Sequence, residues 1–490
     1  MKNIITAVFC SLLLAGACSN TNDVEYGGKR PGIYTQDLAE QNLLRAMEIV
    51  DNAVANYFSG DEMILADKYN PYTGNRSADK GSIWKYTSSI EAVNAVMEGL
   101  KLRKENGSPE LYDRHFDRYA GVLAKLYDNA DYYLGTYTLV SYTQTREWTV
   151  YGVDRSEKGK GMAEVQGIKN VYDDQQWLIR ELIGAYRLTG EAEYLKQAEY
   201  LTEYVLDGWD CTLDADGNEH GGITWGPGYS TKHSCSNGPL VSPLVWLHEL
   251  YKGKSDQITY GYIKPDRSRS AKTVKKSDYY LDFARKVYDW QKTHLMRGDG
   301  VYADMMHNPG TNLNPGDIDL GEGVQLEIVN GVYYRKHASM AGSTGDAISY
   351  NSGTMLSGAA DLYRVTGDNA YMQDLAKLTA DTFRYFAKLG ATLPGYYTYE
   401  ISGFNDWFNN VLMRGYVDAE GVGADAAACI DSFQKNLDYA YENHVYGGML
   451  PTNLLVGWNR DRGKNDTEAL FTFAFAAEYA VLAKYEMEKN

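Results

Sequence analysis

A repeated helix–turn–helix unit constrains the fold of this chain more than any other sequence feature. The stretch AYRLTGEAEYLKQAEYL at Ala185–Leu201 matches LYRVTGDNAYMQDLAKL at Leu362–Leu378, so that Gly190 and Gly367 are equivalent. Each copy predicts a helix that ends at a Thr-Gly turn, with an acidic residue at the start of the next helix. Repeated helical hairpins build solenoids or closed rings, because a single hairpin cannot bury its own apolar face.

Helical periodicity continues from about residue 35 to the C-terminal end of the chain. Twelve helices fit six hairpins, and a closed ring of six inner and six outer helices would bury every inner apolar face without end caps. An open superhelix of the tetratricopeptide kind is the alternative, but it needs a regular period of about 34 residues, which the sequence does not show. The predicted helices are Gln36–Phe58, Ser88–Asn106, Pro109–Leu134, Asp173–Leu188, Ala192–Leu206, Pro239–Tyr251, Ser277–His294, Ala347–Val365, Ala370–Lys388, Phe404–Tyr416, Ala424–Asn443 and Thr467–Glu488.

Long polar and aromatic loops separate several of these helices, and loops of such length in a compact domain usually carry function. Short alternating stretches within them, such as TYTLVSYTQ at Thr136–Gln144, predict minor β-hairpins.

The first residues predict export. MKNIITAVFCSLLLAGAC has a lysine near its start, a mostly apolar stretch and small residues before Cys18. It is too short for a comfortable membrane span and resembles a bacterial lipoprotein signal. We therefore expect a signal peptide over residues 1–17, lipidation of Cys18, a tether over 18–34 and one helical domain over 35–490. The protein is expected to be lipid-anchored in the bacterial outer membrane, facing the periplasm or the cell surface.

Composition narrows the range of partners. The net charge of −17 argues against a nucleic-acid partner, because phosphate binding needs a basic surface. Tyrosine is abundant, with 42 residues, and its ring suits stacking on sugars, although most of these side chains are expected in helix interfaces. Apart from the leader, Cys211, Cys235 and Cys429 allow one disulfide at most, and no Cys/His spacing indicates zinc.

Two adjacent carboxylates, Asp173 and Asp174, begin the helix predicted in NVYDDQQWLIRELIGAYRLTG. Asp173 followed by Gln176 fits a capping box, in which the acid only stabilises the helix start. A pair of carboxylates is also what glycoside hydrolysis requires, one as nucleophile or base and one as the acid that protonates the leaving oxygen. A separation of about 5–5.5 Å favours retention of configuration, and adjacent residues at a helix start can reach it.

Four blocks of the sequence carry a resemblance to a known family. They are YDDQQW at Tyr172–Trp177, GGITWGPG at Gly221–Gly228 with KHSCSNGPL at Lys232–Leu240, SYNSGTMLSGAADLYRVTGD at Ser349–Asp368 and NDWFNNVLMRG at Asn405–Gly415. Together they resemble glycoside hydrolase family 76, the endo-acting α-1,6-mannanases, particularly the lipoprotein forms of gut Bacteroides-type bacteria.

The resemblance implies an all-α (α/α)6 barrel of six helical hairpins with long functional loops, in which 35–490 is a single catalytic domain. It also implies a retaining mechanism and a yeast-type α-1,6-linked mannan as substrate. By the same resemblance, Asp173 is expected to be the nucleophile and Asp174 the general acid/base, although the residues alone leave open which is which.

The second block also offers candidates for substrate binding. Gly221 and Gly222 could bring backbone amides to a sugar, and Trp225 could offer a ring face. An ordinary turn with Trp225 packed inside explains the same residues equally well. Asn237 comes just before a predicted helix, so helix capping competes with contact to a mannose hydroxyl.

Three more candidates lie further along the chain. Tyr350 and Asn351 stand at another helix start and carry the same ambiguity between capping and sugar binding. Asp304, in GVYADMMHN, lies in a loop where the family resemblance implies an acidic residue, which we expect near the sugar at the cleavage point.

Neither a cofactor nor a metal ion is expected. The stretch DADGN at Asp214–Asn218 is similar to a calcium loop, but Glu219 stands where the loop needs its sharp-turn glycine. The expected partner is an α-mannan polysaccharide or oligosaccharide, and the protein is expected to be a monomer apart from its lipid anchor.

Two other functions fit parts of the sequence. A helical surface lipoprotein that captures glycans without cutting them would share the anchor, the helices and the tyrosines, but it has no use for adjacent buried carboxylates. A different (α/α)6 glycoside hydrolase, such as an unsaturated-uronic-acid hydrolase or an exo-acting mannosidase, would share the barrel and differ in its products.

Overall fold

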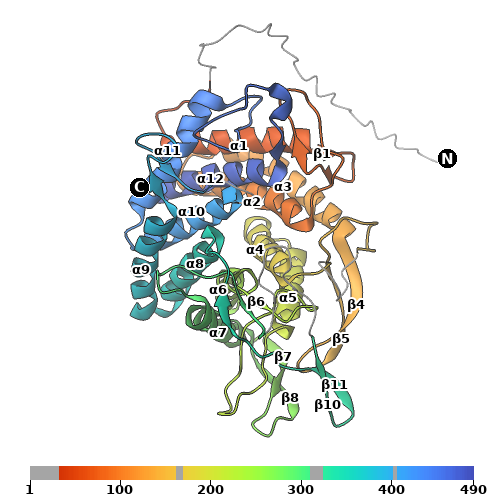
Figure 1. The fold of residues 1–490 in the computed structure, drawn as a ribbon. Coiled ribbons are helices and arrows are strands. Elements are labelled where there is room, and N and C mark those ends of the chain that lie inside the picture. The colour runs from red at the N-terminus through yellow and green to blue at the C-terminus, as the bar shows by residue number, and fades with distance from the viewer. Residues whose placement is uncertain (1–31, 162–168, 310–323, 401–404, 490) are drawn as a thin grey trace, which may run out of the picture. The chain divides into compact units, whose positions relative to one another are not determined.

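The twelve predicted helices are present in the computed structural model, which describes residues 32–161, 169–309, 324–400 and 405–489 (Figure 1). The predicted signal peptide, Cys18 and nearly all of the tether lie outside the described residues. The described cysteines Cys211, Cys235 and Cys429 are free thiols. The helices are α1 Leu38–Tyr57, α2 Ile83–Glu105, α3 Glu110–Ala130, α4 Tyr172–Thr189, α5 Ala192–Asp207, α6 Gly238–Tyr251, α7 Lys276–Leu295, α8 Ser349–Thr366, α9 Asn369–Phe386, α10 Asn405–Gly421, α11 Ala427–His444 and α12 Ala469–Glu488.

The even-numbered helices form a closed inner ring. Helix α2 packs on α4, α4 on α6, α6 on α8, α8 on α10, α10 on α12, and α12 returns to α2. Each odd-numbered helix lies outside, packed on a neighbour in the ring. Helices α3, α5, α7, α9 and α11 each form a hairpin with the inner helix before them, and α1 packs on α12 as the sixth pair. This arrangement is the expected (α/α)6 barrel.

Burial explains which helices are inside. Helix α12 is rich in alanine and phenylalanine on all sides and is buried almost along its whole length, as a helix that is apolar all round must be. Outer helix α3 instead buries one stripe, which includes Phe116, Tyr119 and Leu123, and leaves its charged face in solvent. Apolar residues from both layers form one continuous core.

The repeated turn has the geometry that the sequence predicts. Gly190 and Gly367 end α4 and α8 with φ angles of 77° and 67°, in the left-handed region that favours glycine. The preceding threonines, Thr189 and Thr366, both donate their hydroxyls to the carbonyl four residues earlier, at 2.7 and 2.6 Å. The two copies of the repeat therefore form equivalent hairpins.

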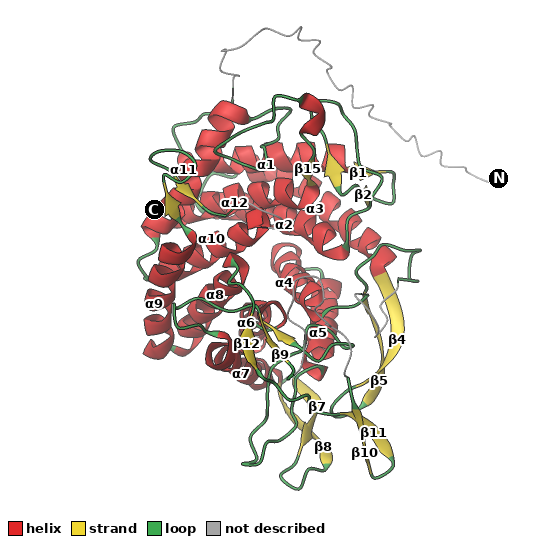
Figure 2. Cartoon of the chain, in the orientation of Figure 1, coloured by secondary structure: helices red, strands yellow, loops and turns green. Residues whose placement is uncertain are grey.

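Three long β-hairpins extend from the loops and lie near one another along the lower right of the molecule (Figure 2). They are β4 Leu134–Val140 with β5 Thr145–Tyr151, β7 Gln257–Ile263 with β8 Arg269–Lys275, and β10 Leu326–Val329 with β11 Val332–Arg335. The first confirms and extends the hairpin predicted at Thr136–Gln144. The shorter strands are β1 Phe58–Ser59, β2 Ile64–Leu65, β3 Lys68–Tyr69, β6 Lys232–His233, β9 Met305–His307, β12 Gly342–Thr344, β13 Lys388–Leu389, β14 Tyr397–Thr398 and β15 Thr467–Glu468.

Because inner and outer helices alternate in direction, all six inner helices begin at the same end of the ring. The loops that lead into them meet at that end, and a short 3₁₀ helix, η2 Ser234–Ser236, precedes α6. No helix in the described ranges is long and apolar enough to cross a bilayer.

Candidate active site

A cavity of about 270 Å³ lies where the inner helices begin. The first turns of α2, α4, α8 and α10 form its floor, and the loops before α6 and α8 form its walls. The side chains that line it are Trp84, Asp173, Asp174, Trp177, Trp225, His233, Cys235, Asp304, Met305, Ile348, Tyr350, Trp407 and Phe408. The structure thus brings both predicted acids to one cavity.

The capping interpretation of Asp173 is wrong. Helix α4 begins at Tyr172, and its N-cap residue, Val171, makes no side-chain hydrogen bond to the helix. Gln176 does not reach back to the helix start, since its amide donates to the carbonyl of Ser236 at 2.6 Å. Gln176 instead holds the loop before α6 against the first turn of α4.

Asp173 is surrounded by hydrogen-bond donors. The backbone N–H of Asp174 donates to its Oδ1 at 3.0 Å, and the thiol of Cys235 and the indole of Trp225 are donors to the same carboxylate. Burial raises the pKa of Asp173 to about 6, while these three donors act in the opposite direction. Near neutral pH this side chain is therefore ionised.

Asp174 lies in a drier environment, with 8% of its surface exposed. Burial, and then the charge of Asp173, raise its pKa well above the usual range, and no hydrogen bond from the described residues offsets them. One acid of the pair is thus adapted to carry charge and the other to carry a proton, which is the division of roles that acid-assisted displacement needs.

Aromatic rings from the inner helices lie beside the two acids on the cavity floor. Trp177 donates its indole N–H to the hydroxyl of Tyr350 at 2.8 Å, and its ring lies 4.8 Å from that of Trp407. Trp84 and Phe408 stack with an interplanar angle of 17°, and the ring of Trp84 also meets that of Trp407 edge to face at 5.2 Å. Such rings offer an apolar face to the C–H groups of a sugar and few strong donors that compete with the carboxylates.

A buried acid on α2, Glu91, holds one of these rings in place. Glu91 accepts hydrogen bonds from the indole of Trp407 at 3.2 Å and from the amide of Asn410 at 2.9 Å, and it pairs with Arg414. These contacts tie α2 to α10 across the ring and fix the orientation of Trp407.

Three other residues predicted from the sequence line the same cavity: Trp225, Asp304 and Tyr350. Trp225 is half-buried, and its ring stacks on His233 with an interplanar angle of 20°. Burial raises the pKa of Asp304 to about 6, while a hydrogen bond from the side chain of Asn351 acts in the opposite direction. Asn351 itself is fully buried behind Asp304 rather than lining the cavity.

Gly221, Gly222 and Asn237 also lie behind the wall. A Cβ on Gly222 would lie 2.4 Å from the ring of Trp290, and one on Gly221 would lie 2.7 Å from it. The glycines therefore allow close approach to a tryptophan of α7, where the sequence suggested approach to a sugar. Asn237 is fully buried and makes no capping bond, and its amide bonds the backbone N–H and C=O of Ile223 at 2.8 and 2.9 Å.

Sequence reasoning missed several residues that line the cavity. Cys235 and His233 lie in the predicted second block without being singled out, and Trp84 and Phe408 lie at the starts of α2 and α10. Burial lowers the pKa of His233 to about 3, so its ring is neutral. Their position in the sequence could have identified them, because each lies at or just before the start of an inner helix.

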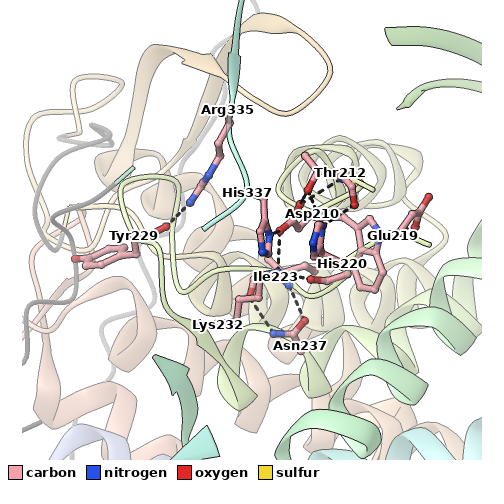
Figure 3. Close-up of polar contacts among 12 residues, drawn as sticks. Asp210, Thr212, Glu219, His220, Ile223, Tyr229, Lys232, Asn237, Arg335 and His337 are labelled. Atoms are coloured by element: carbon pink, nitrogen blue, oxygen red, sulfur yellow. Dashed lines mark hydrogen bonds and ion pairs between the residues drawn. The ribbon is translucent and has the colours of Figure 1, made fainter. Parts of the chain in front are cut away.

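A polar cluster anchors the loop that carries Trp225 (Figure 3). Asp210 is fully buried and accepts hydrogen bonds from Lys232 at 2.9 Å and His337 at 2.7 Å. The ring of His337 stacks on that of His220, with centroids 3.5 Å apart. Burial acts to raise the pKa of Asp210, but the Lys232 charge and the hydrogen bonds hold it below the usual range.

The ligand atoms of Asp210, His220 and His337 lie within 4.8 Å of one another, which is close enough for a metal ion. Lys232 bonds the same carboxylate oxygen as His337. A bound cation would face this buried ammonium at close range, which is strongly unfavourable in a dry environment. The chemistry of the donor set favours a hydrogen-bonded anchor, and it does not fit a metal site.

A larger cavity, of about 580 Å³, lies at the opposite end of the ring, among the C-terminal halves of the inner helices. Carboxylates there are paired with cationic side chains, for example Glu98 with Lys484 at 2.7 Å and Asp361 with Arg364 at 2.5 Å. Burial acts to raise the pKa of Glu98, but Lys484 holds it below the usual range, so this acid carries charge. The cavity has no pair of adjacent acids like Asp173 and Asp174 among the described residues that line it. The smaller cavity at the Asp pair is therefore the candidate active site.

Comparisons with known proteins agree with this geometry. Among curated proteins, none matches the chain. A glycoside hydrolase family 76 mannosidase from Bacteroides thetaiotaomicron has the same fold, with a TM-score of 0.64 and 20% identity over 92% of this chain and 100% of that chain. An inactive variant of the α-1,6-mannanase from Salegentibacter, in which two consecutive aspartates are asparagines and α-1,6-mannotriose is bound, aligns with a TM-score of 0.58 and 15% identity over 92% of this chain and 100% of that chain. The family model named Glycosyl hydrolase family 76 matches residues 119–252 and 325–486, more than half of the sequence. The chain therefore belongs to glycosyl hydrolase family 76.

Proposed function

We propose that this protein is a retaining, endo-acting hydrolase of the α-1,6-linked backbone of yeast-type mannan. The observation that carries the proposal is the pair Asp173 and Asp174, adjacent in one cavity and in environments that separate their pKa values. A protein that only binds glycans gains nothing from two buried acids, because each costs free energy to desolvate.

The pair supplies both halves of a double displacement. Asp174 gives its proton to the glycosidic oxygen as the Asp173 carboxylate attacks the anomeric carbon, which breaks the C–O bond and forms a glycosyl ester. Asp174, now ionised, then takes a proton from water as that water attacks the same carbon and frees Asp173. Two inversions leave the anomeric configuration unchanged.

The cavity favours a neutral sugar. Its acidic side chains are Asp173, Asp174 and Asp304, His233 is neutral, and no lysine or arginine is among the described residues that line it. A uronic acid would place a further negative charge beside these carboxylates, which is unfavourable. This supports a hexose over the unsaturated-uronic-acid substrates of other (α/α)6 enzymes.

The linkage is supported by the relatives. The Salegentibacter enzyme is an α-1,6-mannanase, and its inactive form differs at two consecutive aspartates and holds α-1,6-mannotriose. Because this chain shares that fold and family and also has two adjacent acids, we infer that it acts on the same class of substrate.

Digestion of linear α-1,6-mannan tests the proposal. Endo-cleavage releases a ladder of oligosaccharides early, and NMR of fresh products shows the α-anomer first if configuration is retained. The Asp173→Asn and Asp174→Asn variants should lose more than about a thousandfold in kcat/KM while they keep the melting temperature, whereas Asp214→Asn, at an exposed loop, should keep full activity. Near-normal cleavage by either pair variant, or mannose as the sole early product, would contradict the assignment.

We extend the proposal to the location of the enzyme. Lipidation at Cys18 would hold the catalytic domain on the outer membrane, facing the periplasm or the surface, as a monomer on a tether. Metabolic labelling with a palmitate analogue should mark the wild-type protein and leave Cys18→Ala unlabelled. Label on both proteins, or on neither, would contradict the anchor.

A further inference from the structure

A second cavity, of about 430 Å³, lies on the outer side of the barrel. Outer helices α5 and α7 form its base, and the hairpins β4–β5 and β7–β8 and strand β11 form its rim. It shares no lining residue with the cavity at the Asp pair. Its volume falls within the range of pockets that hold small organic ligands.

Aromatic side chains dominate its surface. Tyr260 and Tyr262 on β7 and Tyr334 on β11 are half-buried at the rim, while Trp209 and Phe283 meet edge to face at the base, with centroids 6.1 Å apart. Arg269 lies over the ring of Tyr334 at 4.5 Å, which holds this ring against the hairpin β7–β8. Half-buried tyrosines offer both an apolar face and a hydroxyl, the combination that suits a sugar ring.

The polar groups of the cavity are balanced. Arg146 pairs with Glu203 at 3.1 Å, and Glu219 accepts from the indole of Trp209 at 2.9 Å and from Lys286 at 3.3 Å. Asp207 accepts from the Ser141 hydroxyl at 2.9 Å. Glu203 and Glu219 thus have basic partners, and burial raises the pKa of Asp207, which accepts only from neutral donors, to about 6. The cavity therefore has little attraction for an ion, and its donors and acceptors fit hydroxyl groups of a neutral ligand.

Two segments that line this cavity also hold the active-site loop that carries Trp225. Along strand β11, Tyr334 lines the cavity while Arg335, on the opposite face, bonds the carbonyls of Pro227 and Tyr229. In the same way Trp209 lines the cavity, while the next residue, Asp210, bonds Lys232 and His337 on the other side (Figure 3). A chain bound in the cavity would therefore rest against the same segments that hold Trp225.

We propose that this cavity is a second carbohydrate site, which binds a stretch of neutral hexose chain outside the active site. The identity of the sugar rests on the proposed function: the occupant is a part of the α-1,6-mannan polymer other than the bond being cleaved. Such a site keeps the enzyme on a long polymer between cleavage events and adds nothing for a short substrate.

The test separates binding from cleavage. In the background Asp173→Asn/Asp174→Asn, which removes turnover, retardation of the protein in native gels that contain linear α-1,6-mannan reports polymer binding. We expect Tyr262→Ala/Tyr334→Ala to weaken this retardation at least fivefold. The matched control is Tyr396→Ala/Tyr439→Ala, a pair of half-buried rings in contact at 5.1 Å between the α9–α10 loop and α11. This pair should retain wild-type binding.

Activity gives the second readout, with the acid pair intact. Tyr262→Ala/Tyr334→Ala should raise KM for polymeric mannan at least fivefold and leave kcat/KM for α-1,6-mannotetraose within twofold. Ala271→Trp, which fills the cavity from exposed strand β8 without removing an aromatic contact, should do the same if the double variant fails to fold. Unchanged polymer binding and unchanged KM in the cavity variants would overturn the second site. Failure of the unmodified enzyme to cut mannotetraose or mannan would instead overturn the proposed function, and the identity of the ligand with it.

Discussion

The guanidinium of Arg335, at the end of β11, donates to the backbone carbonyl of Tyr229 in the loop that carries Trp225 (Figure 3). A second N–H of the same group donates to the carbonyl of Pro227 at 3.1 Å. The ring of Trp225 lies 4.9 Å from that of Tyr229, so one buried side chain fixes the loop that delivers the indole to Asp173.

Arg335→Ala should therefore lower both stability and activity. Each buried carbonyl that loses its donor costs about 1–3 kcal/mol of unfolding free energy, which urea titration measures. We expect kcat/KM on linear mannan to fall more than about tenfold, because the loop no longer holds Trp225 in place. Arg267→Ala is the matched control, since Arg267 also donates to two carbonyls, of Leu213 and Asp214, both at 3.0 Å, but on an exposed turn. Equal losses in the two variants would contradict a specific role for Arg335.

The pH profile of kcat/KM should be bell-shaped. Asp173, the proposed nucleophile, must be ionised to attack, so its pKa of about 6 makes activity fall as the pH drops through that value. Asp174 must be protonated, and because its pKa is raised further, activity falls as the pH rises through the higher value. Asp304 also has a pKa of about 6, so the acid limb must keep its position in Asp304→Asn, although the rate is lower. If the acid limb disappears in that variant, it belongs to Asp304.

The donors around Asp173 should set the position of the acid limb. Cys235→Ala and Trp225→Phe each remove one donor, so the pKa of Asp173 rises and the limb moves to higher pH, by about 0.5–1 unit. Cys235→Ser keeps a donor at the same position and should restore the wild-type profile. A limb that stays fixed in all three variants would show that these side chains do not bond the carboxylate in solution.

Alanine substitutions at two glycines should distinguish the stability cost of a steric clash from that of a left-handed backbone conformation. Gly222 and Gly253 have φ angles of 76° and 80°, but a Cβ meets Trp290 only at Gly222 and meets nothing within 4 Å at Gly253. Gly253→Ala should cost about 1–2 kcal/mol for the left-handed conformation alone. Gly222→Ala should cost about 1–3 kcal/mol more, because it forces Trp290 to move. Similar urea midpoints for the two variants would mean that Trp290 yields without penalty.

Much of the fold could be predicted, because helices and their turns depend on residues that are close together in the sequence. Apolar spacing predicted all twelve helices, and the Thr-Gly turns at Gly190 and Gly367 indicated two of the helix pairs. Both the periodicity and the left-handed glycine depend on near neighbours in the sequence. The hairpin β7–β8 was missed, although QITYGYI and RSAKTVK alternate as strands do.

The site could be predicted only in part, because its contacts join distant segments. Asp173, Asp174, Trp225, Asp304 and Tyr350 meet in one cavity, as their blocks implied. Nothing local indicates whether a glycine pair faces a sugar or the ring of a tryptophan 68 residues later, as between Gly222 and Trp290. The same holds for Cys235, whose thiol matters only because Gln176 draws the backbone of Ser236 onto the start of α4.

The ring closes on itself through the packing of α12 on α2, and all six inner helices begin at the end that holds the acids. The loops that lead into the inner helices can therefore change in length or sequence while the helix–helix contacts of the ring stay the same. Selectivity for linkage and branching can thus diverge quickly among descendants of this architecture, while the scaffold itself changes slowly. Loops from a relative, placed at this end of the helical ring, should confer the relative's selectivity for linkage and branching.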